Sequence, residues 1–102
     1  RRLWIAFAVG SKGRIAVDAG AKEVLQKNRV SLLPAGIISV TGSFTAGDAV
    51  EISGPDGIVF AKGLVRYDSS DLEASVGKQT EDLPGRLSPE VVHADDLVVL
   101  PT

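Results

Sequence analysis

A histidine and two aspartates near the C-terminus are the residues whose types could most directly do chemistry. His93 is followed by Asp95 and Asp96, a combination that can bind a metal ion or exchange protons as an acid–base pair. A histidine metal site needs further ligands, and the chain contains no other histidine and no cysteine. The carboxylate spacing also matches no specific magnesium motif. We therefore interpret these residues as a polar turn leading into the last strand, and we expect no metal site and no catalytic residue.

A glycine-rich segment, Gly10-Ser11-Lys12-Gly13, suggests a second kind of chemistry, the binding of a phosphate group. A Walker-type phosphate loop requires the spacing Gly-x-x-x-x-Gly-Lys-Ser/Thr and a helix directly after it. The chain has neither this spacing nor an expected helix at Gly13. The segment is therefore predicted to be a hairpin turn between two strands.

Length and composition are those of one small folded domain. The 102 residues are 44% hydrophobic and 24% charged, which suits a soluble domain with a single core. The net charge of −2 lacks the basic excess of dedicated nucleic-acid binders. The absence of cysteine fits a cytoplasmic protein, and the absence of methionine suggests a fragment of a longer one. The longest apolar run, Leu3 to Val9, is far shorter than the roughly 20 residues of a membrane span, so no membrane partner is expected.

Short β-branched runs, separated by 11 glycines and 5 prolines, predict a mainly β fold with two short helices. One helix is expected from Ala19 to Lys27 behind an Asp18 cap. The other is expected to open at a capping box formed by Ser70 and Glu73 and to close at Gly77. A mixed-sheet open barrel with the helices closing its ends is the natural packing of such elements. The expected strands cover residues 3–9, 14–17, 37–41, 49–53, 58–67 and 97–100.

Two local patterns support these elements. The helix after Asp18 is amphipathic, with Glu23 and Lys27 one turn apart on its wet face. Its apolar face carries Ala21, Val24 and Leu25. Further along, Gly54-Pro55-Asp56-Gly57 predicts a tight turn between two strands, because Gly57 can adopt a positive φ.

Several motifs along the chain resemble the PUA domain of bacterial glutamate 5-kinases. Three of them look general to PUA domains: Asp18-Ala19-Gly20-Ala21, Gly42-x-Phe44-x-x-Gly47-Asp48 and Gly63-Leu64-x-x-Tyr67. Two look more specific to the kinase: Ser31-Leu32-Leu33-Pro34-Ala35-Gly36 and Glu90-Val91-Val92-His93-x-Asp95-Asp96-Leu97. The resemblance implies a PUA-like pseudo-barrel that forms a single PUA domain over residues 1–102. It also implies a kinase domain N-terminal to Arg1, absent from this chain.

The resemblance implies a function as well. The parent enzyme would transfer phosphate from ATP, with magnesium, to the side-chain carboxylate of L-glutamate in the first step of proline biosynthesis. ATP and magnesium would then be cofactors of the parent, and no cofactor site or catalytic residue carries over to this fragment. The expected partners are its own kinase domain and other subunits of a homo-oligomer, with this domain in an accessory or regulatory role.

The same resemblance points to one candidate surface for RNA or a partner. In RNA-modifying enzymes with PUA domains, RNA lies against the matching helix, the glycine-containing loop and the last strand. The corresponding residues here are Lys22, Lys27, Arg29, Ser31, Leu32, Leu33, Pro34, Ala35 and Gly36. Lys12 is a further candidate for phosphate contacts, and Gly36 would let a backbone approach closely.

Three roles stay open: an accessory domain of a kinase, an RNA-binding module of an RNA-modifying enzyme, and a scaffold with no ligand. The acidic charge and the scarcity of aromatic residues count against RNA, and the lysines also fit a solvated helix face. Leu32, Leu33 and Pro34 fit either an exposed docking surface or part of the core. The kinase-specific motifs favour the first role.

Overall fold

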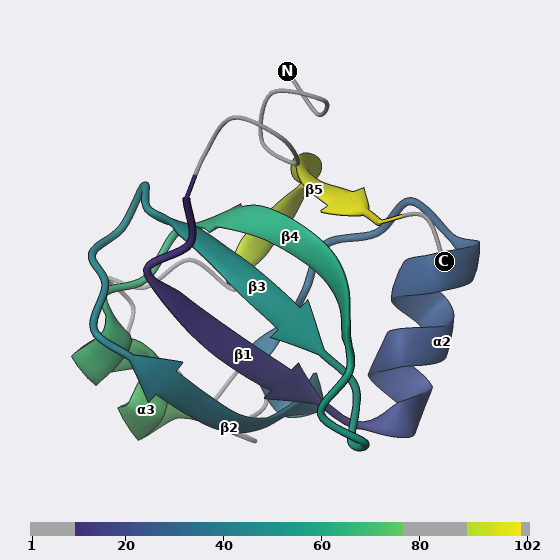
Figure 1. Ribbon diagram of the computed structural model, residues 1–102, viewed down its shortest axis with the longest axis horizontal. Helices are drawn as coiled ribbons and strands as arrows, with labels where there is room; N and C mark the ends of the chain where they lie inside the picture. The colour runs from purple at the N-terminus through teal and green to yellow at the C-terminus, as the bar shows by residue number, and fades with distance from the viewer. Residues whose placement is uncertain (1–9, 77–89, 101–102) are drawn as a thin grey trace.

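The computed structural model describes residues 10–76 and 90–100, and its centre is a five-stranded mixed sheet (Figure 1). The strands lie in the order β2-β1-β3-β4-β5. β1 and β3 run parallel, whereas the other neighbouring strands are antiparallel. The two outer strands of the described sheet are not paired with each other, so this sheet is open. The strand bounds are Gly13–Val17 for β1, Ile37–Gly42 for β2, Ala49–Ser53 for β3, Val59–Val65 for β4 and Val92–Val99 for β5.

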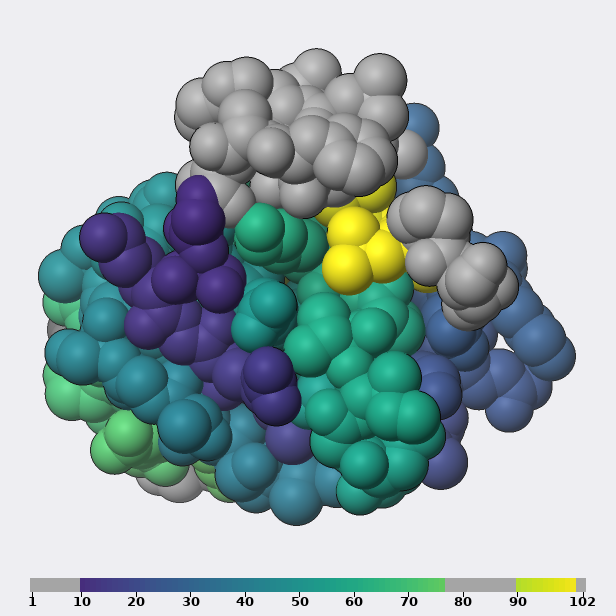
Figure 2. Space-filling model, viewed as in Figure 1, coloured from purple at the N-terminus to yellow at the C-terminus, as the bar shows by residue number. Residues whose placement is uncertain are grey.

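Two α-helices lie at opposite ends of this sheet (Figure 1). Helix α2 (Ala19–Lys27) directly follows β1, and helix α3 (Ser69–Ser75) contacts β2. A short 3-10 helix, η1 (Pro34–Gly36), precedes β2. In surface view, β1, β3 and β4 form one continuous face with α2 at its right-hand end (Figure 2). The mainly β fold with a mixed, open sheet and two short helices is thus confirmed.

The core lies where the alternating residues of the central strands meet the helices. Ile15 and Val17 of β1 and Val50 and Ile52 of β3 are fully buried, as the alternation in these strands predicts. Glu51, between the last two, is half-buried and points away from the core. Helices α2 and α3 and the segment before η1 each add one buried leucine: Leu25, Leu72 and Leu32.

The turn between β3 and β4 has the predicted backbone conformation. Gly57 has a φ of 82°, and its N–H donates to the carbonyl oxygen of Gly54 over 3.0 Å. A side chain at this φ would be strained, which explains the glycine. The turn residues lie close to α2, because a Cβ atom placed on Gly54 would come within 2.8 Å of the Lys22 side chain.

The predicted start of the second helix is wrong. Asp68, rather than Ser70, occupies the N-cap position, and Ser70 lies inside the first turn. Asp68 makes no capping bond, and its Oδ1 instead accepts the Ala46 N–H over 2.8 Å. The Ser69 hydroxyl accepts the Phe44 N–H over 3.3 Å. Contacts with the loop after β2 therefore fix where this helix begins.

The last strand is longer than predicted. β5 begins at Val92 rather than Leu97, so His93, Asp95 and Asp96 lie within a strand and the interpretation as a polar turn is wrong. Pairing explains the difference, because Val92 lies opposite Val65 of β4 on one side and forms a bridge with Leu32 on the other. This pairing supplies backbone partners that a polar sequence does not reveal.

The other predicted bounds agree to within two residues. The helix at 19–27 and the strand at 49–53 match, whereas β4 ends at Val65 rather than Tyr67. The predicted strand at 3–9 lies outside the described residues. So do the closing Gly77 and the second strand that a hairpin at Gly10–Gly13 requires.

Candidate binding site

The first wall of the candidate surface is helix α2, and the sequence fixes both of its ends. Oδ1 of Asp18 accepts the Ala21 N–H over 2.7 Å, as expected of an N-cap. At the other end, the Asn28 N–H donates to the carbonyl oxygen of Val24 over 2.8 Å. Leu25 turns into the core, but Val24 of the same predicted apolar face is 46% exposed. The helix therefore leaves part of its apolar face uncovered.

The second wall is the segment from Ser31 to Gly36, which is tied to β5. The Leu32 N–H donates to the Val92 carbonyl oxygen over 2.9 Å, and the Val91 N–H donates to that of Leu32 over 2.7 Å. Leu32 is 2% exposed and Pro34 is buried, whereas Leu33 is 44% exposed. The segment is expected from the sequence to be either an exposed docking surface or part of the core. Each expectation holds for some of its residues, because Leu32 and Pro34 belong to the core and Leu33 to the surface.

Between the two walls lies a groove of about 470 Å³, which we call the α2 groove. Gly36 allows the walls to meet at one end, because a Cβ atom there would lie 2.8 Å from Cβ of Ala21. The close approach that Gly36 allows is therefore made by the Ala21 side chain of α2. Among the described residues that line the groove, Asp18 is the only charged one. The lining consists of Asp18, Gly20, Ala21, Val24, Leu25, Val30, Ser31, Leu32, Leu33, Ala35 and Gly36.

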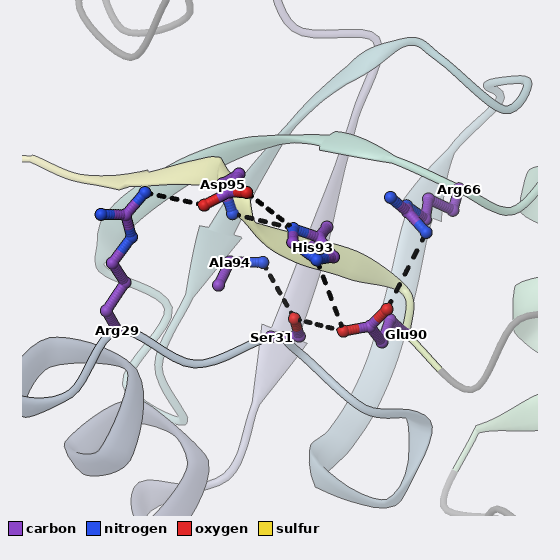
Figure 3. Close-up of polar contacts among 7 residues, drawn as sticks. All are labelled: Arg29, Ser31, Arg66, Glu90, His93, Ala94 and Asp95. Atoms are coloured by element: carbon purple, nitrogen blue, oxygen red, sulfur yellow. Dashed lines mark hydrogen bonds and ion pairs between the residues drawn. The ribbon is translucent and has the colours of Figure 1, made fainter.

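A polar cluster joins Ser31, at the start of the second wall, to β5 (Figure 3). The Ser31 hydroxyl donates to Oε2 of Glu90 over 2.7 Å and accepts the Ala94 N–H over 2.9 Å. Arg66 lies 3.8 Å from the other oxygen of Glu90, and Nε2 of His93 lies 3.9 Å from Oε2. The Ser31 hydroxyl thus both donates and accepts a hydrogen bond, and these bonds anchor the start of the groove wall to β5.

Asp95 extends this cluster to the loop after α2 (Figure 3). Its Oδ1 accepts a hydrogen bond from Arg29 over 2.7 Å, and its N–H donates to Nδ1 of His93 over 3.0 Å. His93 therefore has a structural role within β5 in this arrangement.

The candidate cations all lie outside the α2 groove, and three of them are paired. Lys22 lies 3.9 Å from Asp56 and 5.7 Å from the centre of the Phe60 ring. Lys27 pairs with Glu23 over 2.9 Å, and Arg29 pairs with Asp95 as described. Lys12 precedes β1, whereas α2 follows the other end of that strand, so the fold does not bring Lys12 to this surface. A smaller hollow of about 350 Å³, between the end of α2 and β5, is lined in part by Lys27 and Arg29.

The one described residue with a clearly shifted pKa, Tyr67, does not line the α2 groove. Burial raises the pKa of Tyr67 above its usual value, and the nearby Asp71 carboxylate raises it further. Tyr67 is 1% exposed and belongs to the core, and it is not among the residues that line the groove. Among residues 10–76 and 90–100, no three histidine, aspartate or glutamate side chains gather in a way that would hold a metal ion.

The sequence pattern predicts Ser31 as a site residue but does not reveal the residues that bind its hydroxyl or complete its polar cluster. Glu90, Ala94 and Arg66 complete the polar cluster, and Asp18 and Val24 contribute to the groove. Glu90 belongs to a motif noted for its resemblance, which is the one signal that could have drawn attention to it. Its contact with Ser31 spans 59 residues and leaves no local trace.

Comparisons with known proteins agree with this fold. Residues 13–86 match the family model described as the PUA domain. The chain is 46% identical over 100 residues to the glutamate 5-kinase of Mycobacterium avium strain 104, and 47% identical to that of Mycobacterium tuberculosis strain H37Rv. Each alignment covers 98% of this chain but 27% of the relative, so the chain spans about a quarter of the length of these relatives.

A solved structure provides a further comparison. The crystal structure of a PUA domain from Aeropyrum pernix K1, in complex with tartrate, superposes with a TM-score of 0.61 at 33% identity. The superposition covers 91% of this chain and 50% of that one. No helix in the described part of the chain has the length and apolar character to cross a membrane.

Proposed function

This chain belongs to the PUA domain family, and from that premise we propose that it is the accessory and regulatory domain of a glutamate 5-kinase. The observation that carries the proposal is the 46–47% identity to such kinases along 98% of the chain. Because the identity extends over nearly the whole chain, it reaches beyond the features that PUA domains share in general.

The parent enzyme would transfer phosphate from ATP to the side-chain carboxylate of L-glutamate, in the cytoplasm, as the first step of proline biosynthesis. ATP and Mg²⁺ would bind to the other three-quarters of the enzyme, which this chain does not include. The partners of this domain are then its own kinase domain and other subunits of a homo-oligomer. The α2 groove is the surface that best suits a protein partner, because its exposed lining is largely apolar.

The alternative, an RNA-binding module of an RNA-modifying enzyme, has weaker support. Affinity for RNA comes mainly from cations that neutralise phosphates. Lys22, Lys27 and Arg29 each have an acidic neighbour within 4 Å, which offsets their charge, and none of them lines the groove.

The proposal is tested on the complete gene product that carries this domain. The protein is incubated with ATP, Mg²⁺ and L-glutamate, and the acyl phosphate is trapped with hydroxylamine as the hydroxamate. We expect hydroxamate that depends on both ATP and glutamate. If the protein forms no hydroxamate but modifies RNA, the proposal is refuted and the alternative is favoured.

A further inference from the structure

We propose that the α2 groove binds an apolar segment of the kinase part of its own polypeptide, with a lysine or arginine of that segment next to Asp18. This inference rests on the proposed function, because the partner is the rest of the same enzyme. It assigns the partner, the residues that bind it and the chemistry of the contact.

The lining of the groove selects an apolar partner. Val24 of α2 and Leu33 of the second wall both line it, and both are nearly half exposed. Exposed apolar side chains gathered in one depression are typical of an interaction site rather than of ordinary surface. The described lining includes no lysine or arginine, so a phosphate group would find no cation inside the groove.

Asp18 adds a charge preference at the rim. One of its carboxylate oxygens caps α2 through the Ala21 N–H, and the residue is exposed. A lysine or arginine of the partner could pair with this carboxylate without disturbing the cap, because a carboxylate has several acceptor positions. A negatively charged partner would instead be repelled.

The size of the groove favours a tethered partner over a second free copy. A stable contact between separate proteins buries about 1,600 Å² in total, and two half-exposed side chains supply only a small part of that. A tether raises the effective concentration of a partner to about the millimolar range, so a small contact can still be occupied. In the relatives this domain is attached to a part nearly three times its size, which provides such a tether.

The groove is also formed in advance. Backbone hydrogen bonds from Leu32 to β5 and the close contact of Gly36 with Ala21 hold its two walls in place. A preformed site avoids the entropy cost of ordering the walls on binding, which again allows a small contact to suffice.

The test measures thiol labelling at the groove in the complete enzyme. Ala35→Cys places a thiol in the lining, and Ala74→Cys places a matched thiol on the exposed surface of α3, outside it. The chain has no cysteine of its own, so each labelled peptide identifies its site. If the groove is occupied about nine-tenths of the time, the thiol at position 35 should react about tenfold more slowly than the one at position 74.

Second substitutions then identify the contact. In the Ala35→Cys background, Leu33→Ser should restore fast labelling, and Asp18→Asn should restore it in part, since asparagine keeps the helix cap but lacks the charge. Ile58→Ser is the matched control, because Ile58 is also a large exposed apolar side chain, 64% exposed against 44% for Leu33, but lies outside the groove, and it should change nothing.

The remaining outcomes of the labelling experiment distinguish failure of this inference from failure of the proposed function. Equal labelling at positions 35 and 74 in an enzyme that phosphorylates glutamate would overturn this inference alone. Protection that disappears on dilution would assign the groove to a second copy, and protection that requires added RNA would assign it to RNA; both overturn the inference. A folded protein without glutamate-dependent activity would refute the proposed function, and the kinase part would no longer be the partner.

Discussion

The Ser31 hydroxyl donates a hydrogen bond of 2.7 Å to Oε2 of Glu90, although 59 residues separate the two in the chain. The Ser31 hydroxyl oxygen also accepts the Ala94 N–H, so one small side chain joins the groove wall to β5 in two ways. The position of this wall therefore depends on a half-buried polar contact as well as on the burial of Leu32.

We expect Ser31→Ala to lower the free energy of unfolding by about 1–3 kcal/mol, because it leaves the Ala94 N–H and the Glu90 carboxylate without this partner. Urea denaturation gives the change, with Ser43→Ala, an exposed serine between β2 and β3, as the control. Equal denaturation midpoints for the two variants would show that the cluster does not anchor the wall.

Ser70→Ala should leave stability almost unchanged, because Ser70 lies inside the first turn of α3 and alanine favours helix. If Ser70 were instead the N-cap of a capping box, the same change would cost about 1 kcal/mol. Thermal unfolding of this variant beside Ser69→Ala separates the two cases, since Ser69 accepts the Phe44 N–H and its loss should be the larger.

Lys22→Ala should destabilise the chain by about 0.5–1 kcal/mol, because Lys22 lies over the Phe60 ring and packs on the turn at Gly54. Lys27→Ala removes only an exposed ion pair one helical turn apart and should cost less, about 0.3–0.5 kcal/mol. Denaturant melts of both variants provide the comparison. A larger loss for Lys27→Ala would contradict the structural role of Lys22.

Tyr67 should weaken the fold at alkaline pH. Its pKa in the native state is raised above the unfolded value of 10.0, first by burial and second by Asp71. The native state therefore keeps the tyrosine proton after the unfolded state has lost it, so the free energy of unfolding falls as the pH rises above about 10.

The control for this pH dependence is Tyr67→Phe, which removes the titrating group. Urea melts between about pH 9 and pH 11 should show a shallower decline in this variant than in the unsubstituted chain. Parallel declines would mean that groups other than Tyr67 dominate in this range.

Local signals in the sequence predict much of the fold. The Asp18 cap and the 3.6-residue spacing place α2 to the residue, and the Gly54–Gly57 turn fixes the hairpin of β3 and β4. These features depend on neighbours a few residues apart, so the sequence alone contains them.

Features that depend on distant contacts could not be read in the same way. The polar run at His93–Asp96 becomes strand because β4 and Leu32 pair with its two sides. The parallel pairing of β1 with β3 and the meeting of Gly36 with Ala21 likewise arise only in the folded chain. The α2 groove is built from such contacts, so the sequence named only part of its lining, within Ser31 to Gly36, and could not predict the arrangement.

The central claim is that this domain serves a protein partner and does not bind RNA through its cations. Titration of a labelled tRNA with the domain-bearing protein at about 50 mM and 200 mM salt tests it most directly. The claim predicts no saturable binding at either salt concentration, because Lys22, Lys27 and Arg29 are paired with acidic side chains. Saturable binding that weakens linearly in log affinity against log salt, and that is lost in Lys22→Ala or Arg29→Ala, would contradict it.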